Sequence, residues 1–512
     1  MGIVVPAKTL MIQGTSSSAG KSILVTALCR IFKQDGLQVA PFKAQNMALN
    51  SFVTTEGGEI GRAQAVQAEA AGIEPSVDMN PVLLKPEADS RCQVIVMGKV
   101  ARTISANDYY LYTPQLIETV RSALGRLRSA YDVVVIEGAG SPAEINLKDR
   151  EIANMRAARM AQAPVLLVGD IDRGGVFASL VGTLELLEDE ERDRIKGFII
   201  NKFRGDLKLL QPGLDFLEKR TLKPVLGVVP YFRDIRIAQE DSVYLDERID
   251  NQPSYDLDIA VIHLPHISNY DDFDPLEEDG CRVRYVRRPN EIGNPHLIIL
   301  PGTKSTVIDL KYLWQSGLAE KILQQAQAGT PVIGICGGYQ MLGKRVLDPL
   351  GVESAEREAS GLGLLDVVTS FAAEKSTRQV KARVSANRGL LAGVKRQELT
   401  GYEIHMGQTS GDDDTSAFLI FETPQGAADY YDGTLNAEGT VLGTYMHGLF
   451  HNSGFRQALL AYLRRRAGLP EKSEETSPGK EQQYDRLADL IRQSLDIPAI
   501  YRIMNEVKDK KA

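Results

Sequence analysis

The sequence is poor in several features that would assign a chain to a particular class of protein. Four cysteines in 512 residues, with no C-x-x-C spacing, argue against a disulfide framework and against a cysteine-ligated zinc site. No apolar run approaches the ~20 residues that span a bilayer, and the N-terminus lacks the charged and then apolar pattern of a secretory signal. We therefore predict no membrane partner and a cytoplasmic location.

Basic residues are also in short supply. With 59 Lys and Arg against 67 Asp and Glu, the formal net charge is -8, which argues against a non-specific nucleic-acid binder and a basic membrane-surface protein. Charged residues make up 25% of the chain and hydrophobic residues 43%, as in ordinary globular proteins. This composition favours small polar ligands as partners, and it leaves the oligomeric state open, a homo-oligomer included.

The length of the chain predicts more than one domain, because a single hydrophobic core seldom serves 512 residues. The sequence becomes acidic and broken near residue 250, and a fresh apolar run follows. We expect a first domain over residues 1–248, a linker over 249–256 and a second domain over 257–470. Residues 471–512 are expected to form a polar linker and a helical tail. A solvated terminal helix is the simplest interpretation of that tail, and a cover for a domain interface or dimer contact is the alternative.

A phosphate-binding loop is the clearest motif of the first half. A short apolar strand is followed by the segment GTSSSAGKS, from Gly14 to Ser22, and then by a helical stretch. In such loops, backbone amides at glycine and small residues, here Gly14, Thr15 and Gly20, point at phosphate oxygens. Lys21 would neutralise the terminal phosphates, and the Ser22 hydroxyl is a candidate ligand of Mg²⁺. A Ser/Gly-rich surface turn is the less favoured alternative.

Further apolar runs predict a mainly parallel sheet in this half, flanked by helices. Runs without alternation suit strands that are buried on both faces, and ligands of such sheets bind at the carboxyl ends of the strands. The runs are residues 9–13, 38–42, 131–136, 164–168, 197–200 and 224–229. Polar residues after these runs are candidates for binding: Glu137 and Asp170 for Mg²⁺, and Lys43, Gln45 and Asn46 for a substrate. For Glu137, a capped turn is the alternative.

The second half places one cysteine where a nucleophile is displayed. Cys336 lies in the segment GICGGYQ, on a glycine-flanked turn between an apolar run and a helical stretch. Glycines permit the strained backbone of a strand-to-helix elbow, and a helix N-terminus favours a thiolate. His447 follows another apolar run far downstream and completes a candidate Cys/His pair. A buried structural cysteine is the plainer alternative.

The segment around Cys336 resembles the G-x-C-x-G-x-Q signature of class I glutamine amidotransferases. The resemblance implies that Cys336 attacks the side-chain amide of glutamine, that His447 acts as the general base, and that ammonia is released. It also implies oxyanion-hole amides at Gly302, where an ordinary Pro-Gly turn is an equal alternative, and at Gly337. Most members carry H-x-E, but here Leu449 stands in place of the acid. We therefore expect another group, such as a backbone carbonyl, to orient His447.

The first half has a resemblance of its own. Its loop is one residue longer than the common G-x-x-x-x-G-K-[ST] pattern and in this resembles dethiobiotin synthetase, a P-loop ATPase. Asn201 and Lys202 resemble the segment that contacts adenine in these ATPases. The resemblance implies ATP and Mg²⁺ as cofactors, with Asn201 in the nucleotide site.

Four longer segments together resemble the cobyric acid synthase family. They are PFKAQNM at 41–47, EGAGSPAEINL at 137–147, DIDRGGVFAS at 170–179 and GYEIHMG at 401–407. The resemblance implies ATP- and glutamine-dependent amidation of the b, d, e and g carboxylates of adenosylcobyrinic acid a,c-diamide, a corrinoid substrate. It also makes His405 a candidate substrate contact, although a structural histidine is an equal alternative.

Two other functions remain as alternatives. Cobyrinic acid a,c-diamide synthase combines the same two domain types and also lacks the H-x-E acid. A regulatory ATPase of the ParA/MinD type, fused to an inactive amidotransferase-like module, is less favoured, because the loop lacks the Lys-Gly-Gly start of those proteins and both Cys336 and His447 are present. The expected fold class is α/β, with a mainly parallel sheet in each of the two domains.

Overall fold

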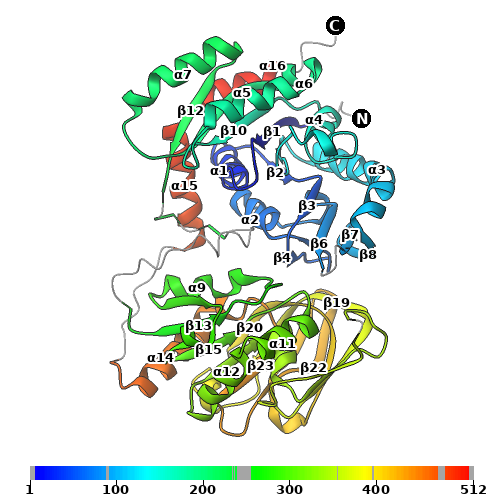
Figure 1. Ribbon diagram of the computed structural model, residues 1–512, viewed down its shortest axis with the longest axis vertical. Helices are drawn as coiled ribbons and strands as arrows, with labels where there is room; N and C mark the ends of the chain where they lie inside the picture. Colours follow the sequence, from blue (N-terminus) through cyan, green and yellow to red (C-terminus); the bar gives the residue numbers. More distant parts are fainter. Residues whose placement is uncertain are drawn as a thin grey trace.

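The computed structural model describes residues 6–87, 91–232, 234–235, 237–238, 255–354, 356–394, 397–470 and 479–506. Two α/β domains lie one above the other in Figure 1, the first described to residue 238 and the second from residue 255. Residues 249–254 of the expected linker and the polar stretch 471–478 lie outside the described residues. Within the described ranges, no helix is long and apolar enough to cross a membrane.

The first domain is built on a six-stranded sheet whose pairings are all parallel, in the order β12-β11-β10-β1-β9-β2. The strands are β1 (Lys8–Gly14), β2 (Val39–Phe42), β9 (Val133–Glu137), β10 (Val165–Asp170), β11 (Ile195–Phe203) and β12 (Val225–Pro230). They coincide with the six apolar runs of the first half, which confirms the predicted parallel sheet.

Both faces of this sheet are covered, which explains why its strands are apolar throughout. Successive residues of a strand point to opposite faces. Accordingly, Leu10 and Ile12 join the core under α1, whereas Met11 joins the core on the other face. The helices are α1 (Lys21–Gln34), α2 (Arg62–Ala71), α3 (Ala106–Ala130), α4 (Met155–Ala161), α5 (Val176–Leu186), α6 (Asp189–Arg194) and α7 (Leu207–Thr221).

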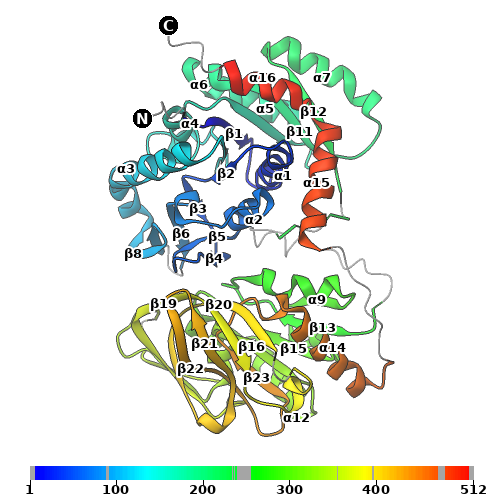
Figure 2. The same ribbon diagram turned by 180° about the vertical axis from the view of Figure 1, so that it is seen from behind.

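A small sheet lies between the main sheet and the second domain, and the sequence patterns did not predict it. Its order is β3-β6-β7-β8, and a two-stranded hairpin, β4-β5, lies beside it (Figure 2). The bounds are β3 (Gln45–Met47), β4 (Ser51–Val53), β5 (Glu59–Gly61), β6 (Val82–Pro86), β7 (Arg91–Val96) and β8 (Lys99–Ser105). These strands are short, and several carry buried polar residues, so they lack a clear apolar signature.

The second domain contains a larger, mixed sheet of eleven strands. One half, in the order β14-β13-β15-β16-β23, is parallel. Its strands are β13 (Asp258–Ile262), β14 (Arg282–Val286), β15 (Leu297–Leu300), β16 (Val332–Ile335) and β23 (Val441–Thr444). The described helices around it are α9 (Asp274–Glu278), α10 (Pro289–Ile292), α11 (Thr306–Gln315), α12 (Leu318–Gln327), α13 (Gly337–Leu342) and α14 (Ser453–Ala467).

The other half of this sheet is mostly antiparallel, so the expected mainly parallel character holds for the part that carries Cys336 and His447. Its strands are β17 (Arg345–Leu347), β18 (Glu358–Ser360), β19 (Val368–Val384), β20 (Glu398–Ser410), β21 (Ser416–Thr423) and β22 (Gly426–Leu435). Several of these strands are partly exposed, and partly exposed strands alternate in polarity instead of forming continuous apolar runs.

The C-terminal tail returns to the first domain, as both ribbon views show (Figures 1 and 2). It consists of α15 (Lys480–Ser494) and α16 (Ile497–Glu506). Leu487, Ile491 and Ile500 are fully buried in the core under α1. The simplest expectation, a solvated terminal helix, is therefore wrong for residues 480–506, because both helices are amphipathic and bury their apolar faces on the sheet.

Candidate active sites

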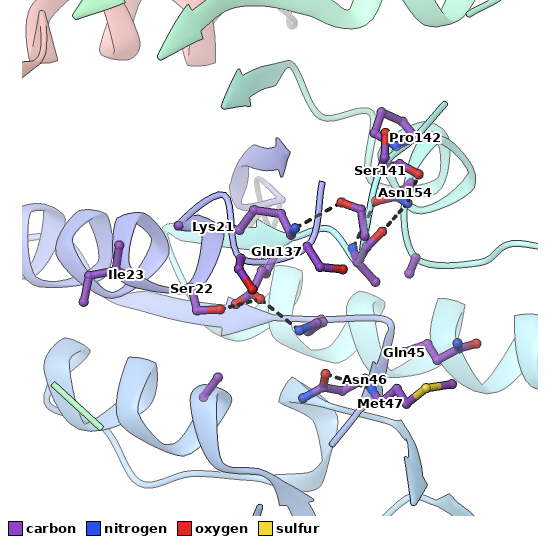
Figure 3. A pocket seen from close by; sticks show the side chains of 18 of the residues that line it. Lys21, Ser22, Ile23, Gln45, Asn46, Met47, Glu137, Ser141, Pro142 and Asn154 are labelled. Atoms are coloured by element: carbon purple, nitrogen blue, oxygen red, sulfur yellow. Dashed lines mark hydrogen bonds and ion pairs between the residues drawn. The ribbon is translucent and has the colours of Figure 1, made fainter. Parts of the chain in front are cut away.

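The phosphate-binding loop joins β1 to α1 as predicted. Gly20 has a positive φ of 100°, and a β-carbon there would lie 2.0 Å from Nδ2 of Asn201, so the position requires glycine. Asn201 in turn donates to the carbonyl of Ala19 at 2.9 Å. Lys21 Nζ donates to the carbonyls of Ser16 and Gly140, at 2.8 and 3.0 Å, so its ammonium group lies over the loop (Figure 3).

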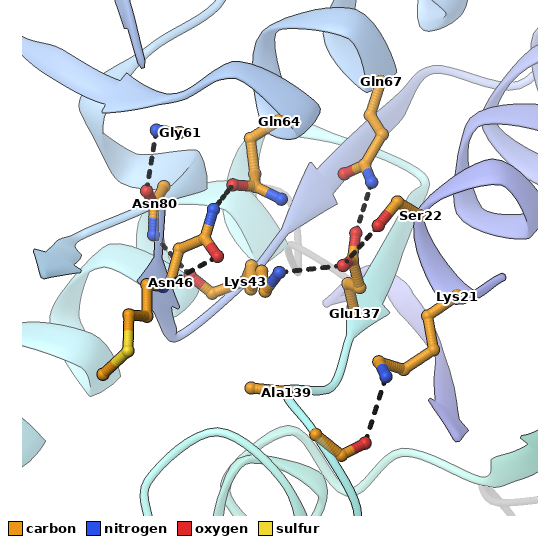
Figure 4. A network of polar contacts seen from close by, with 12 residues as sticks. Lys21, Ser22, Lys43, Asn46, Gly61, Gln64, Gln67, Asn80, Glu137 and Ala139 are labelled. Atoms are coloured by element: carbon orange, nitrogen blue, oxygen red, sulfur yellow. Dashed lines mark hydrogen bonds and ion pairs between the residues drawn. The ribbon is translucent and has the colours of Figure 1, made fainter. Parts of the chain in front are cut away.

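A carboxylate stands next to the loop at the end of β9. Glu137 accepts hydrogen bonds from Ser22 Oγ at 2.8 Å, Lys43 Nζ at 2.9 Å and Gln67 Nε2 at 2.5 Å (Figure 4). Burial would raise the pKa of Glu137, but the Lys43 charge and these hydrogen bonds outweigh it and hold the pKa below its ordinary value. A charged carboxylate beside a serine hydroxyl suits Mg²⁺, which prefers oxygen ligands.

The other predicted metal ligand has different partners. Asp170, at the end of β10, forms an ion pair with Lys202 at 2.8 Å and lines the same cavity as Glu137. Among the described residues, no group of three or more His, Cys, Asp or Glu side chains could hold a metal ion. Two protein ligands, Ser22 and Glu137, are enough for the usual pattern of Mg²⁺ in nucleotide sites, because substrate phosphates and water supply the remaining ligands there.

A large cavity of about 980 Å³ opens beside the loop. Lys21, Ser22, Glu137 and Asn201 line it, and so do the predicted substrate residues Lys43, Gln45 and Asn46. The volume is at the upper end of the range for small-molecule sites, which gives room for more than a nucleotide.

The predicted substrate residues are held by neighbouring side chains. Asn46 Nδ2 donates to Gln64 Oε1 at 3.0 Å, and Gln45 accepts a short hydrogen bond from the hydroxyl of Tyr109. These partners fix both side chains at the cavity wall, where Figure 3 shows them.

The elbow around Cys336 has the geometry of a displayed nucleophile. Cys336 joins β16 to α13 with φ 51° and ψ -108°, a backbone conformation that non-glycine residues rarely adopt. Its amide donates to the carbonyl of Thr444 at 2.8 Å, which ties the elbow to β23. A β-carbon at Gly338 would lie 2.0 Å from the carbonyl oxygen of Leu300, so the helix can pack on β15 only with glycine there.

His447 lies next to Cys336 and has a carboxylate partner. Its Nδ1 is 2.7 Å from Oδ2 of Asp272, and Oδ1 of Asp272 accepts from the amide of Gly448 at 2.8 Å. The expectation of a backbone carbonyl as the orienting group is therefore wrong. Burial would lower the pKa of His447, but the charge and hydrogen bond of Asp272, together with Cys336, raise it to about 10.

The structure thus contains a Cys–His–Asp triad whose acid the sequence analysis missed. Asp272 lies in a short 3-10 turn, Tyr270–Phe273, between β13 and α9 and 175 residues before His447. No local motif links the two positions, because the fold alone brings them together. The acid-rich run SNYDDFD at 268–274 is the only signal in the sequence, and by itself it resembles a solvated loop.

Both predicted oxyanion residues are near the triad. A β-carbon at Gly302 would lie 3.0 Å from Cε1 of His447, and one at Gly337 would lie 2.6 Å from Cγ2 of Thr303. The loop that carries Gly302 is anchored through Thr303, whose hydroxyl donates to the carbonyl of His266 at 3.1 Å. The two glycines therefore lie on adjoining segments beside His447 and Cys336.

A second, smaller cavity of about 60 Å³ lies at the triad and is lined by residues of both domains. Cys336, His447 and Gln340 come from the second domain, and Lys85 and Gln93 come from the first. His405, the other predicted substrate residue, also lines this small cavity. Among the described residues, it does not line the large cavity. Its ring stacks on Tyr445 with 3.8 Å between centroids.

Known proteins match both halves of the chain. Residues 10–243 match the CobQ/CobB/MinD/ParA nucleotide binding domain, and residues 258–455 match the CobB/CobQ-like glutamine amidotransferase domain. A cobyric acid synthase of Dehalococcoides mccartyi is 63% identical over 500 residues, which cover 98% of this chain and 99% of the relative. The chain belongs to the cobyric acid synthase family. A cobyric acid synthase of Sorangium cellulosum is 57% identical over 513 residues, which cover 97% and 99% of the two chains.

Two solved structures that resemble the chain each match less than half of it. PurLQS from Thermotoga maritima covers 40% of this chain and 99% of its own, at 20% identity and a TM-score of 0.32. The signal recognition particle receptor FtsY of Elizabethkingia anophelis, in complex with GDP, covers 45% of this chain and 58% of its own, at 18% identity and a TM-score of 0.27.

Membership of the cobyric acid synthase family makes the chain an ATP-dependent ligase of cobalamin biosynthesis that uses glutamine as nitrogen donor. The match spans nearly the whole of both chains, which favours this family over a ParA/MinD-type ATPase with an inactive module.

Proposed function

We propose that this protein amidates the b, d, e and g side-chain carboxylates of adenosylcobyrinic acid a,c-diamide, with ATP and glutamine, and so forms adenosylcobyric acid. The observation that carries the proposal is the combination of a phosphate-binding loop on a large cavity with a Cys–His–Asp triad on a small one. One site activates a carboxylate, and the other supplies the nitrogen.

At the triad, His447 already holds the proton of Cys336 as an imidazolium, and the Cys336 sulfur attacks the side-chain amide carbon of glutamine. Amides of Gly302 and Gly337 stabilise the oxyanion, and His447 returns the proton to the leaving ammonia. His447 then takes a proton from water, which hydrolyses the thioester to glutamate and frees Cys336. Glu353 and Lys304 also line this cavity and match the ammonium and carboxylate groups of glutamine.

At the loop, a carboxylate oxygen of the corrinoid attacks the γ-phosphorus of ATP, ADP leaves, and an acyl phosphate forms. Lys21 and the loop amides hold the phosphates, while Ser22 and Glu137 would hold Mg²⁺. The ion, when bound, neutralises phosphate charge. Ammonia then attacks the acyl carbon, phosphate leaves, and the amide remains. Lys43, Gln45 and Asn46 line the cavity where the corrinoid would bind.

The paired strands β6 and β7 contribute residues to the linings of both cavities. Lys85 and Gln93 are paired across β6 and β7 and face the small cavity. Their neighbours Pro86 and Cys92 face the large cavity, as the alternation of strand side chains requires. Oε1 of Gln93 is buried and has no hydrogen-bond partner among the described residues, so it can accept from an N–H donor.

The ion pair between Lys304 and Glu87 marks the expected crossing point for ammonia. Lys304 lines the small cavity, Glu87 lines the large one, and they form an ion pair at 2.8 Å. We propose that ammonia passes beside this pair, because a hydrogen-bonded strand ladder leaves no space between its strands.

The test exchanges the nitrogen source. Cys336→Ala is expected to abolish glutamine-dependent amidation and to leave ammonia-dependent amidation intact, whereas Lys21→Ala should abolish both. Cys281→Ala is the matched control, because Cys281 is a buried cysteine outside both cavity linings. Mass spectrometry of the corrinoid product counts the amides. Full glutamine-dependent activity of Cys336→Ala would refute the glutaminase role, and amidation at positions a and c would point to cobyrinic acid a,c-diamide synthase.

A further inference from the structure

A charged residue of the first domain reaches the turn that carries the triad acid. Arg62, the first residue of α2, forms an ion pair with Asp271, with Nε and Oδ2 2.8 Å apart. Asp271 directly precedes Asp272, which holds His447. Arg62 is 4% exposed and both aspartates are 2% exposed, so this contact is made away from solvent. The Coulomb attraction between opposite charges is stronger at such burial than at the surface, because less water screens it.

The turn needs this cation, because it carries two adjacent buried carboxylates. Burial raises the pKa of Asp271, the Arg62 charge acts against that, and the nearby Asp272 raises the pKa further. Lys480 and His447 also lower the pKa of Asp271, but less than Arg62 does. Without Arg62, the repulsion between the two carboxylates would therefore be less well offset, and the turn could relieve it by moving or by taking up a proton. Either change would displace the partner of His447.

Other residues of the first domain hold the same turn. The amide of Ser51 donates to Oδ1 of Asn269 at 3.1 Å, and the amide of Tyr270 donates to Oδ1 of Asn50 at 3.4 Å. Tyr402, whose ring stacks on His447 with 5.3 Å between centroids, donates through its hydroxyl to the carbonyl of Ser51 at 3.4 Å. The turn that carries the triad acid is therefore held in part by residues of the first domain.

The same helix also reaches the nucleotide site. Gln67 of α2 donates to Glu137, and Gln64 accepts from Asn46 at the wall of the large cavity (Figure 4). Gln64 and Gln67 are fully buried, and Nε2 of Gln64 and Oε1 of Gln67 have no hydrogen-bond partner among the described residues. Buried polar atoms without partners are unfavourable, so these contacts are poised to rearrange when ligands arrive.

We propose that Arg62 is a positioning residue of the glutaminase triad, supplied by the synthetase domain, and that α2 links the triad to the Ser22–Glu137 site. The inference rests on the proposed function and names its internal coupling. A ligand that recruits Glu137 and Ser22 competes with Gln67 for the same carboxylate. A shift of α2 in response is passed through Arg62 to Asp271 and Asp272, so the occupied synthetase site sets the rate at which glutamine is hydrolysed.

The first experiment measures glutamine hydrolysis with glutamine alone. Arg62→Ala is expected to lower kcat by about 10- to 100-fold with little change in KM, because small misplacement of a catalytic group has effects of this size. Arg62→Lys keeps the charge and should recover most of the loss. Ammonia-dependent amidation should stay within about twofold of wild type in both variants. The control is Arg126→Ala, which removes an arginine from an ion pair with Asp78 on the exposed face of α3.

The second experiment follows covalent capture of Cys336 by a thiol-reactive glutamine analogue, with mass spectrometry, in the presence and absence of Mg²⁺ and a non-hydrolysable ATP analogue. The nucleotide should change the capture rate of the wild type severalfold. In Gln67→Met, which keeps the side-chain size but removes the hydrogen bond to Glu137, the ratio of the two rates should fall to about one.

Three results would overturn the inference. The first is a glutaminase rate of Arg62→Ala equal to that of Arg126→Ala. The second is a loss of ammonia-dependent amidation in Arg62→Ala as large as its loss of glutaminase activity. The third is a capture rate of the wild type that does not change when the nucleotide is added. Glutamine hydrolysis and the capture of Cys336 are measured without a corrinoid, and only the ammonia-dependent amidation assay needs one. A wild type that hydrolyses glutamine but amidates no corrinoid would therefore refute the proposed function and leave the role of Arg62 to be decided by the hydrolysis and capture assays.

Discussion

At the scale of single residues, the proposed glutaminase chemistry rests on the contact between His447 and Asp272. A histidine whose Nδ1 is bound to a buried carboxylate keeps one tautomer and one ring orientation, so its Nε2 faces the nucleophile. The acid comes from a turn after β13 instead of from the position two residues after the histidine, where Leu449 is buried in the core. The triad is complete although the H-x-E pattern is absent.

Asp272→Asn should therefore damage the glutaminase site in a way that pH reveals. We expect glutaminase kcat to fall by about 10³- to 10⁴-fold, as when the acid of a comparable triad is changed to an amide. Asp272 raises the pKa of His447, to about 10, so its loss lowers that pKa. The imidazolium that must protonate the leaving ammonia then loses its proton at lower pH.

The measurement is a pH profile of glutamine hydrolysis. The alkaline limb should lie near pH 10 in the wild type and should move to lower pH in Asp272→Asn. Asp279→Asn is the control, because Asp279 lies in the same region but pairs with Arg456 outside the triad. A variant with unchanged kcat and an unmoved alkaline limb would contradict the role of Asp272.

At the scale of elements, the tail shows that a short amphipathic helix can belong to a distant domain. The backbone of Leu495 forms a β-bridge with Gly227 of β12, and a β-carbon at Gly227 would lie 2.0 Å from the carbonyl of Ser494. Arg30 of α1 forms ion pairs with Glu481 and Asp485, both at 2.7 Å. The tail is thus a structural part of the first domain.

A charge in the tail should destabilise the first domain. Ile500→Asp places a carboxylate at a fully buried position and is expected to lower the free energy of unfolding by about 3 kcal/mol. Leu209→Asp is the control, because Leu209 is 84% exposed and should change stability by less than about 0.5 kcal/mol. Urea denaturation followed by circular dichroism measures both. Equal midpoints for the two variants would mean that the packing of α16 contributes little.

The elements also explain which parts of the fold could be predicted from the sequence. Strands buried on both faces, such as β1 and β9, appear as continuous apolar runs, and both functional elbows follow such runs with glycines. The small sheet around β6 and β7 gave no such signal, because Lys85 and Gln93 are buried polar residues in the middle of its strands. Lys85 and Gln93 line a cavity that they share with the second domain. A contact between distant parts of the chain leaves no periodic pattern in the sequence.

At the scale of the whole molecule, a buried ion cluster joins the two domains beside the small cavity. Glu59 of β5 forms ion pairs with Lys85 of β6 and with Lys375 of β19, both at 2.5 Å. Burial would raise the pKa of Glu59, but the two lysines outweigh it and hold the pKa well below its ordinary value. Lys85 and Lys375 also line the cavity of the triad, so the cluster forms part of its wall.

Removal of this carboxylate should open the wall between the glutaminase site and solvent. Glu59→Gln leaves two buried ammonium groups without a counter-charge, and breaking a buried pair in this way costs about 3–5 kcal/mol. The domains should separate at this point, because separation returns the lysines to water. Ammonia formed at Cys336 would then escape, and more glutamate than amide would be produced.

The ratio of glutamate to amide therefore reports the integrity of the interface. We expect a ratio near one for the wild type and a ratio well above one for Glu59→Gln, while added ammonium chloride still supports amidation. Glu422→Gln is the control, because Glu422 pairs with Lys381 on an exposed part of β21. The contradicting outcome uses ¹⁵N-labelled glutamine with unlabelled ammonia in solution. If Glu59→Gln kept a ratio of one and its product carried no unlabelled nitrogen, ammonia would have to reach the large cavity by a path that this ion cluster does not enclose.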